Sequence, residues 1–213
     1  MPHMTRTATI SLPIVLALTL TACGSDDDSN SATKTFTSRA AAPPATTQPS
    51  PASTTNADGT ATPGTKAKLG RPILLTYDSG DHKGILQVTV TRIEKGSRAD
   101  LDKLSGLSGD ALEATPYYVH AVIKNAGTTD LSHSFLEPPT GLLKDGTAAR
   151  ELLVIGTFDK CDSYPKTTKF GPGASYETCK PVLAEPGSTV TGAAWSGSGY
   201  PDFPASAGVT WTR

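Results

Sequence analysis

Apolar and polar side chains alternate along much of the chain after Ala67, in short runs divided by turn-forming residues. The clearest case is GILQVTVTRIE, residues 84–94, where the alternation has the period of a half-buried strand. Leu86, Val88 and Val90 are expected to face the core, and the polar residues between them to face solvent. The pattern therefore predicts an extended strand over these residues.

A second alternating run, PYYVHAVIKN, covers residues 116–125 and ends in the turn sequence N-A-G. Tyr117 begins one face of this strand, whereas Tyr118 and His120 share the other. Since adjacent residues of a strand point to opposite faces, we expect one of the two tyrosines to be exposed or to lie at a sheet edge.

The remaining apolar runs are short and are separated by the turn sequences S-G-D, K-D-G, G-P-G and E-P-G. One helical turn or two is expected where Ser97 can cap a helix and Asp100 lies three residues further on. About seven or eight short strands with almost no helix predict an all-β antiparallel sandwich. The further expected strands are Pro72–Tyr77, Gly141–Leu143, Glu151–Phe158, Ser175–Ala184, Thr189–Trp195 and Val209–Thr212, and the expected helix is Ser97–Leu104.

The N-terminus has the pattern of an export signal. Residues 8–22 form a mostly apolar run preceded by Arg6, and the run is shorter than the about 20 residues that a spanning helix needs. It ends in L-T-A-C, which resembles the lipobox of bacterial lipoproteins, in which the cysteine is lipidated and becomes the first mature residue. Cys23 is thus the expected lipidation site. The alternatives are an ordinary signal with a free cysteine, or an uncleaved anchor, and the start codon can be Met1 or Met4.

Three segments follow from this pattern. Residues 1–22 are the expected signal peptide, and residues 23–66 are the lipidated cysteine and a linker of mainly Ser, Thr, Ala and Pro. Such a composition cannot bury enough apolar surface to fold, so the linker is expected to be disordered. Its Thr/Pro clusters are possible sites of glycosylation. Residues 67–213 are the expected folded domain, with its own core.

Charge narrows the choice of partners. The net charge is −1, and no run of basic residues is present, so the composition argues against binding nucleic acid. The expected location is the extracytoplasmic face of the cell membrane, held by the lipid on Cys23. The expected partner, besides the membrane, is an unidentified surface protein or a component of the cell wall.

Two cysteines remain after Cys23. Cys161 and Cys179 are an even pair in a chain expected to be exported, where thiols oxidise, so they predict a disulfide. A metal or redox pair is the alternative, but neither cysteine has a second cysteine or a histidine at ligand spacing.

Candidate catalytic residues are scattered. His82, His120 and His133 each stand alone in the sequence and are expected to be solvated. The string W-S-G-S-G at 195–199 lacks the glycine two residues before either serine that a hydrolase elbow has, and a hairpin tip is expected there. We therefore expect no catalytic residues.

Cofactor and metal sites are not indicated either. The two methionines, Met1 and Met4, precede the expected mature chain, which leaves no soft ligands for copper. Asp100, Asp102 and Asp110 do not form a calcium loop, and a solvated acidic helix face is expected for them.

Both tryptophans, Trp195 and Trp211, lie in expected late strands. Packing in the core is the expected role, and a sugar-stacking face is the alternative.

The order of motifs resembles a known family. YYVHAVIKNAGTTDLS, LLKDGT, Cys161, FGPG, Cys179 and LAEPGSTVTG follow one another as in a family of bacterial, actinobacterial-type, lipoprotein domains of unknown function. The resemblance covers about residues 84–211 and implies a telokin-like, immunoglobulin-like sandwich at the cell surface. It implies no reaction.

These features together predict a lipid-anchored surface lipoprotein whose immunoglobulin-like domain binds or scaffolds a partner and is not an enzyme. The alternative is an accessory protein of a transporter or wall enzyme that binds a small molecule or a cell-wall fragment. A concave pocket with convergent polar groups would favour this alternative.

Overall fold

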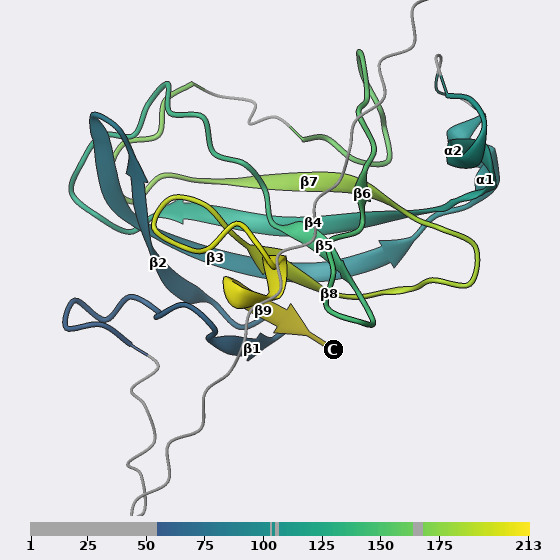
Figure 1. Ribbon diagram of the computed structural model, residues 1–213. Helices are drawn as coiled ribbons and strands as arrows, with labels where there is room; N and C mark the ends of the chain where they lie inside the picture. Colours follow the sequence, from purple (N-terminus) through teal and green to yellow (C-terminus); the bar gives the residue numbers. More distant parts are fainter. Residues whose placement is uncertain (1–54, 103, 105–106, 164–167) are drawn as a thin grey trace, which may run out of the picture. The chain divides into compact units, whose positions relative to one another are not determined.

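Two β-sheets make up most of the structure, a computed structural model that describes residues 55–102, 104, 107–163 and 168–213 (Figure 1). Nine strands and three short helices are found among these residues. The strands are β1 (Lys66–Lys68), β2 (Ile73–Ser79), β3 (His82–Lys95), β4 (Thr115–Asn125), β5 (Thr140–Leu143), β6 (Arg150–Glu151), β7 (Ser175–Ala184), β8 (Val190–Trp195) and β9 (Val209–Thr212). The helices are α1 (Arg98–Leu101), α2 (Asp110–Glu113) and the 3₁₀ helix η1 (Ala205–Ala207).

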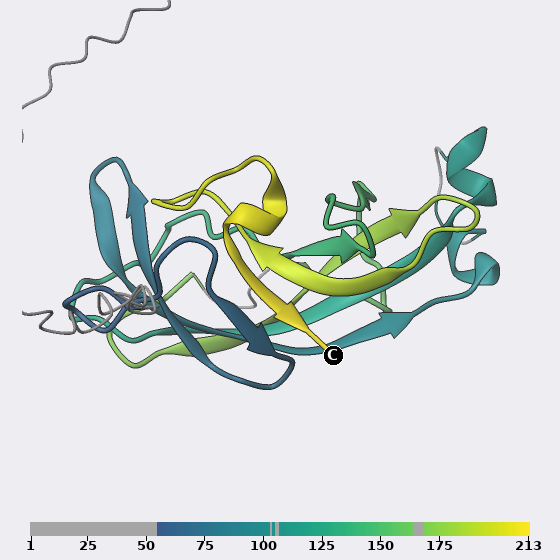
Figure 2. The ribbon, with the colours of Figure 1, turned by 60° about the horizontal axis from the view of Figure 1, so that its bottom comes forward.

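The larger sheet has the order β2-β3-β4-β7-β6, and the smaller sheet has the order β1-β9-β8-β5. Every pairing is antiparallel except that of β1 with β9. The views in Figure 1 and Figure 2 show β8 and β9 as a layer against the long strands β3 and β4. The predicted all-β, mainly antiparallel sandwich is therefore confirmed.

The predicted alternation in β3 is confirmed as far as Val90. Leu86, Val88 and Val90 are fully buried, whereas the next buried residue is Ile93 and not the residue at position 92. A register shift between Val90 and Arg92 in the pairing with β4 explains this change, because one extra residue moves the following side chains to the other face.

The strand β4 lies in the middle of the larger sheet and is buried on both faces. Tyr117 faces the other sheet with Val119 and Ile123, in the main core. Tyr118 points the opposite way and is nevertheless fully buried, at 0% exposure. The expectation that one of the two tyrosines is exposed or at an edge is therefore wrong.

Cover for the outer face of β4 comes from segments that are not strands. The ring of Tyr118 packs edge-on against Phe158, with 5.6 Å between ring centres, in a small cluster with Cys161 and Cys179. Its hydroxyl donates to Asp100 Oδ2 at 3.1 Å. Burial and this carboxylate raise the pKa of Tyr118, so its hydroxyl stays neutral.

The helix α1 is shorter than the predicted Ser97–Leu104, although it begins where predicted. Asp100 accepts a hydrogen bond from the backbone N–H of Ser97 at 2.8 Å, and this bond keeps the pKa of Asp100 below its usual value. Asp100 is only 6% exposed, so the predicted solvated acidic face is wrong for this residue. The helix α2 was not predicted from the sequence.

The predicted strand Glu151–Phe158 is also wrong for most of its length. Only Arg150–Glu151, as β6, pairs with β7, and one more backbone bond joins Leu152 N to Pro181 O at 3.1 Å. Beyond this point the chain leaves the sheet edge. We call residues 152–163 the strap, because they run from this edge across to the disulfide.

The folded domain includes residues before the predicted boundary at residue 67. Ala61 lies in the core, its N–H donates to Leu74 O, and its carbonyl accepts from the Tyr200 hydroxyl, both at 2.8 Å. The strand β1, which adds one strand to the eight predicted, begins at Lys66. The C-terminal part of the predicted linker, from Thr55, therefore belongs to the folded domain. The predicted signal peptide and Cys23 lie outside the described residues.

Cys161 and Cys179, the predicted pair, form a disulfide with 5.1 Å between their Cα atoms. It joins the strap to β7. Replacing both cysteines by serine is expected to lower the free energy of unfolding by roughly 3 kcal/mol, because the unfolded chain regains the freedom of the closed loop. Chemical denaturation of the two proteins measures this difference. Equal stabilities, or unchanged melting of the parent protein in reductant, would contradict the prediction.

Candidate functional site

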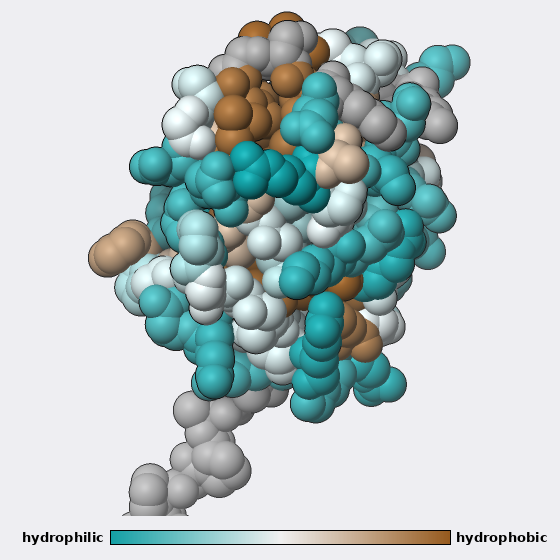
Figure 3. Space-filling model, turned by 90° about the vertical axis from the view of Figure 1, so that its right-hand side faces the viewer, coloured by the Kyte–Doolittle hydropathy of each residue, from teal (hydrophilic) through white to brown (hydrophobic). Residues whose placement is uncertain are grey.

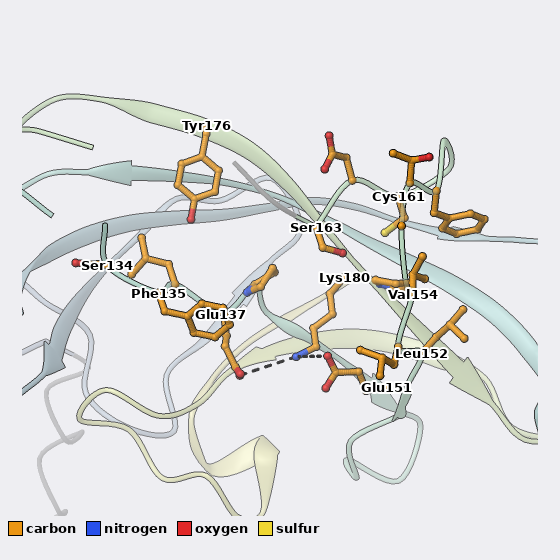
Figure 4. Close-up of a pocket in the computed structure, with 18 of the residues that line it drawn as sticks. Ser134, Phe135, Glu137, Glu151, Leu152, Val154, Cys161, Ser163, Tyr176 and Lys180 are labelled. Atoms are coloured by element: carbon orange, nitrogen blue, oxygen red, sulfur yellow. Dashed lines mark ion pairs between the residues drawn. The ribbon is translucent and has the colours of Figure 1, made fainter. Parts of the chain in front are cut away.

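An open cavity of about 800 Å³ lies beside β7, at the edge of the larger sheet where the strap leaves it. Three segments surround it: residues 131–138 after β4, the strap, and the inner face of β7. Figure 4 shows side chains from these segments converging, with Phe135 and Glu137 on one side and Leu152 and Val154 on the other.

The walls of the cavity are mixed, with apolar surface in the majority and charged side chains among it, and the apolar surface continues onto its rim. Phe135 is 73% exposed and Leu153 is 76% exposed, although both line the cavity. Ile155, next to the rim on the strap, is 92% exposed. Figure 3 shows hydrophobic surface gathered at the top of one end of the molecule, within a mainly hydrophilic face. Large apolar side chains gathered at the mouth of a cavity are typical of a binding site.

The cavity has a charged group at its floor. The side chain of Lys180 is only 10% exposed and reaches between Glu151 Oε1, at 3.4 Å, and Glu137 Oε2, at 4.0 Å (Figure 4). Both glutamates are largely exposed. Within the described residues, the Lys180 ammonium has these two ion pairs but no hydrogen bond.

The position of Lys180 follows from the register of β7. Lys180 pairs with Val119, and Val182 with Tyr117, so these side chains share the inner face of the sheet. Val182 is covered by the other sheet, but Lys180 lies where the sheets diverge. Burying an ammonium group is costly unless it is paired, and the two glutamates supply that pairing.

Tyr176 precedes Lys180 by four residues in β7, so its side chain lies on the same face of the strand. It also lines the cavity. Burial, with Tyr77 near by, raises the pKa of Tyr176 to about 12. Its hydroxyl is therefore neutral at ordinary pH and acts as a hydrogen-bonding group rather than as a base.

A second, smaller cavity of about 190 Å³ adjoins the first, and Lys180, Glu137 and Pro138 line both. Trp195 lines the smaller one. Its indole Nε1 is buried and has no hydrogen-bond partner among the described residues. The Oγ atom of Ser134, a residue that lines the larger cavity, is likewise buried without a hydrogen-bond partner among these residues. Buried polar atoms without partners are uncommon in proteins, and here both belong to residues that line a cavity.

The three predicted solitary histidines are not brought together. His82 is exposed at the start of β3, and His133 lines the larger cavity with a left-handed backbone, φ 64°. His120 is not solvated as predicted, because its side chain is only 15% exposed. Its Nε2 atom lies 3.9 Å from Cys179 Sγ and 3.6 Å from Glu94 Oε2. Burial, and to a lesser extent Arg92, lower the pKa of His120.

Other candidates from the sequence have structural roles. The string at 195–199 forms a tight turn, closed by two backbone bonds between Gly197 and Tyr200. Trp195 and Trp211 are both core residues, so they do not form an exposed sugar-stacking face. No cluster of three or more potential metal ligands occurs in the part of the chain that the structure describes.

Comparisons with known proteins leave the family unassigned. No protein-family model, no curated protein and no solved structure matches this chain. None of the described helices is long and apolar enough to span a membrane.

Neither Lys180 nor the cavity was predicted from the sequence. One signal was present: a lysine at an inward position of the strand Ser175–Ala184, between the apolar neighbours of a buried run. Because charged groups in such positions are rare unless paired, this lysine could have been marked as a candidate.

The two tryptophans offer a direct test of the unpartnered indole. Trp211 Nε1 donates to Arg71 O at 2.9 Å, whereas Trp195 Nε1 has no partner in the described residues. Trp211→Phe should therefore destabilise the fold more than Trp195→Phe, by about 1 kcal/mol, because it alone leaves a carbonyl without its donor. Denaturant unfolding of both variants measures the difference. A larger loss for Trp195→Phe would show that this indole has a protein partner.

Proposed function

We propose that this protein is a lipid-anchored, extracytoplasmic binding protein whose domain holds a small amphiphilic ligand, such as a cell-wall fragment, in the larger cavity. The observation that carries the proposal is the cavity itself, with mainly apolar walls, an apolar rim and a paired lysine at its floor. Cavities of this size with a few convergent polar groups are typical of ligand-binding sites.

Location and fold class in this proposal rest on the sequence. L-T-A-C at the end of the apolar run supports lipidation of Cys23, and the polar stretch that follows supports a tether from the membrane. The motif order from YYVHAVIKN to LAEPGSTVTG supports an immunoglobulin-like, telokin-like variety of the sandwich, in the resembled family of lipoprotein domains. The disulfide fits an oxidising compartment.

Binding is a better account of the site than catalysis. Lys180 is held between two carboxylates, and no serine or histidine in the described residues lies within hydrogen-bond reach of its ammonium. Nucleophilic catalysis requires a nucleophile with an adjacent base that activates it. His133, the histidine that lines the cavity, forms no such pair with Ser134, whose hydroxyl has no partner among these residues.

The anchor has a simple test. Cys23→Ala should release the protein from membranes of the native host or leave its precursor uncleaved, because the acyl chains provide the membrane affinity. Fractionation and intact mass of the protein measure this result, and Ser25→Ala, two residues further on, is the control that keeps both Cys23 and the disulfide. A Cys23→Ala protein that is cleaved and still bound to membranes would contradict the anchor.

The cavity is tested with N-phenylnaphthylamine, a neutral probe that fluoresces in apolar surroundings, on the full chain carrying Cys23→Ser. Phe135→Ser is expected to weaken probe binding roughly fivefold or more, because the ring no longer contributes apolar contact. Phe203→Ser is the matched control: this side chain is also highly exposed, at 89%, but does not line the cavity. Equal responses of the two variants would contradict the site.

A protein partner at the rim is the second candidate, favoured by the exposure of Ile155. Ile155→Ser separates the two functions. It should leave probe binding unchanged, since Ile155 is not among the residues that line the cavity. If it abolishes crosslinking to a surface protein, the scaffolding function is supported.

A further inference from the structure

Two donor groups at the junction of the two cavities make no hydrogen bond among the described residues, although two carboxylates lie near one of them. Lys180 has three ammonium donors and no hydrogen bond among the described residues, and Trp195 Nε1 is buried without a partner. Both residues line the smaller cavity. Because the buried indole N–H of Trp195 lacks an acceptor, which costs free energy, an oxygen acceptor from a ligand in this place would be stabilised, and the Lys180 ammonium beside the same cavity could share it.

Charge restricts what that acceptor can be. Glu137 and Glu151 already oppose the single positive charge of Lys180. Asp159 and Asp162 also line the larger cavity, so acidic groups outnumber the one lysine there. A ligand carboxylate would be repelled by this excess. A ligand ammonium would be attracted to the glutamates, but it has no acceptor to offer to Lys180 or Trp195.

An uncharged amide satisfies both sides of this floor. Its carbonyl oxygen accepts from Lys180 or Trp195, and its N–H donates to Glu137 or Glu151, whose side chains are 70% and 62% exposed and free to move. An ester offers the carbonyl oxygen but no donor. The apolar walls next to the floor then take an apolar group on the same ligand.

We propose that the junction of the two cavities, at Lys180, Trp195, Glu137 and Glu151, is an amide subsite, and that the ligand is an uncharged amide bearing an apolar group. This proposal rests on the proposed function, because it assigns the polar end of a ligand held in the same cavity. N-acyl sugars and peptides both carry such a group.

Four probes with one phenylpropyl skeleton test it: phenylpropanamide, phenylpropanoate, phenylpropylamine and methyl phenylpropanoate. Each is titrated at millimolar concentration into the isotope-labelled full chain with Cys23→Ser, and binding is followed by NMR. The chain has two tryptophans, so the spectrum contains two indole N–H signals, which Trp195→Phe and Trp211→Phe assign. Trp211 serves as the internal control, because its indole is bonded to Arg71 O.

The amide is expected to bind about tenfold more tightly than the anion, and more tightly than the amine and the ester. It should move the Trp195 indole signal and leave that of Trp211 unchanged. Equal binding of the anion, the amine or the ester, or an unmoved Trp195 signal when the amide is bound, would overturn the subsite. If only the NMR signals of residues at the rim of the cavity move, the subsite is wrong but the proposed binding function is still supported. If no probe shifts any residue that lines the cavity, the proposed function fails as well.

A pair of lysine variants separates a role in binding from one in folding. Lys180→Met keeps the length of the side chain and removes its donors, and it should weaken amide binding roughly tenfold. Lys124→Met, on the outer face of the neighbouring strand β4, is the matched control and should bind normally. Retained affinity for the amide in a folded Lys180→Met protein would overturn the role of the lysine.

Discussion

The middle of β4 carries large side chains on both of its faces, and most of the structure can be understood as the means of covering them. On the inner face, Tyr117 and its neighbours pack against the smaller sheet. On the outer face, Tyr118 has no second sheet to cover it, so α1 and the strap do so. Burying a side chain of this size contributes about 2 to 3 kcal/mol, which is enough to hold a segment without regular structure against a sheet.

The same arrangement creates the cavity. Only two residues of β6 continue the sheet beyond β7, and the strap then departs at Leu152 and returns where Cys179 N donates to Asp162 O. Between these two points the strap stands away from the edge of β7, and its apolar side chains form one wall. Lys180 lies beneath this opening because the alternation of β7 places it inward. The cavity is thus a consequence of where a strand ends, rather than of any motif.

Regular strands were predictable from the sequence, and the irregular segments that define the site were not. β3, β4, β7, β8 and β9 form where apolar runs predicted strands, although burial alternates clearly only in β3 as far as Val90 and the other four strands are buried along most of their length. The run E-L-L-V-I-G-T-F has the composition of a strand, yet most of it is strap, since tertiary contacts with Tyr118 outweigh strand propensity. The disulfide could be predicted by counting the cysteines that remain after Cys23. The ion pair between Lys180 and Glu137 could not, because these residues are distant in sequence and no local pattern connects them.

The disulfide has a consequence for where the protein can act. One wall of the cavity is fastened to β7 by a covalent bond that forms only in an oxidising compartment. Without the disulfide the strap would be held by the packing of Leu152 and Phe158 and by a few hydrogen bonds. In the exported protein that we propose, completion of the cavity would be coupled to translocation: the newly made chain would lack this covalent bond in its cavity wall, and would gain it only after leaving the cell interior.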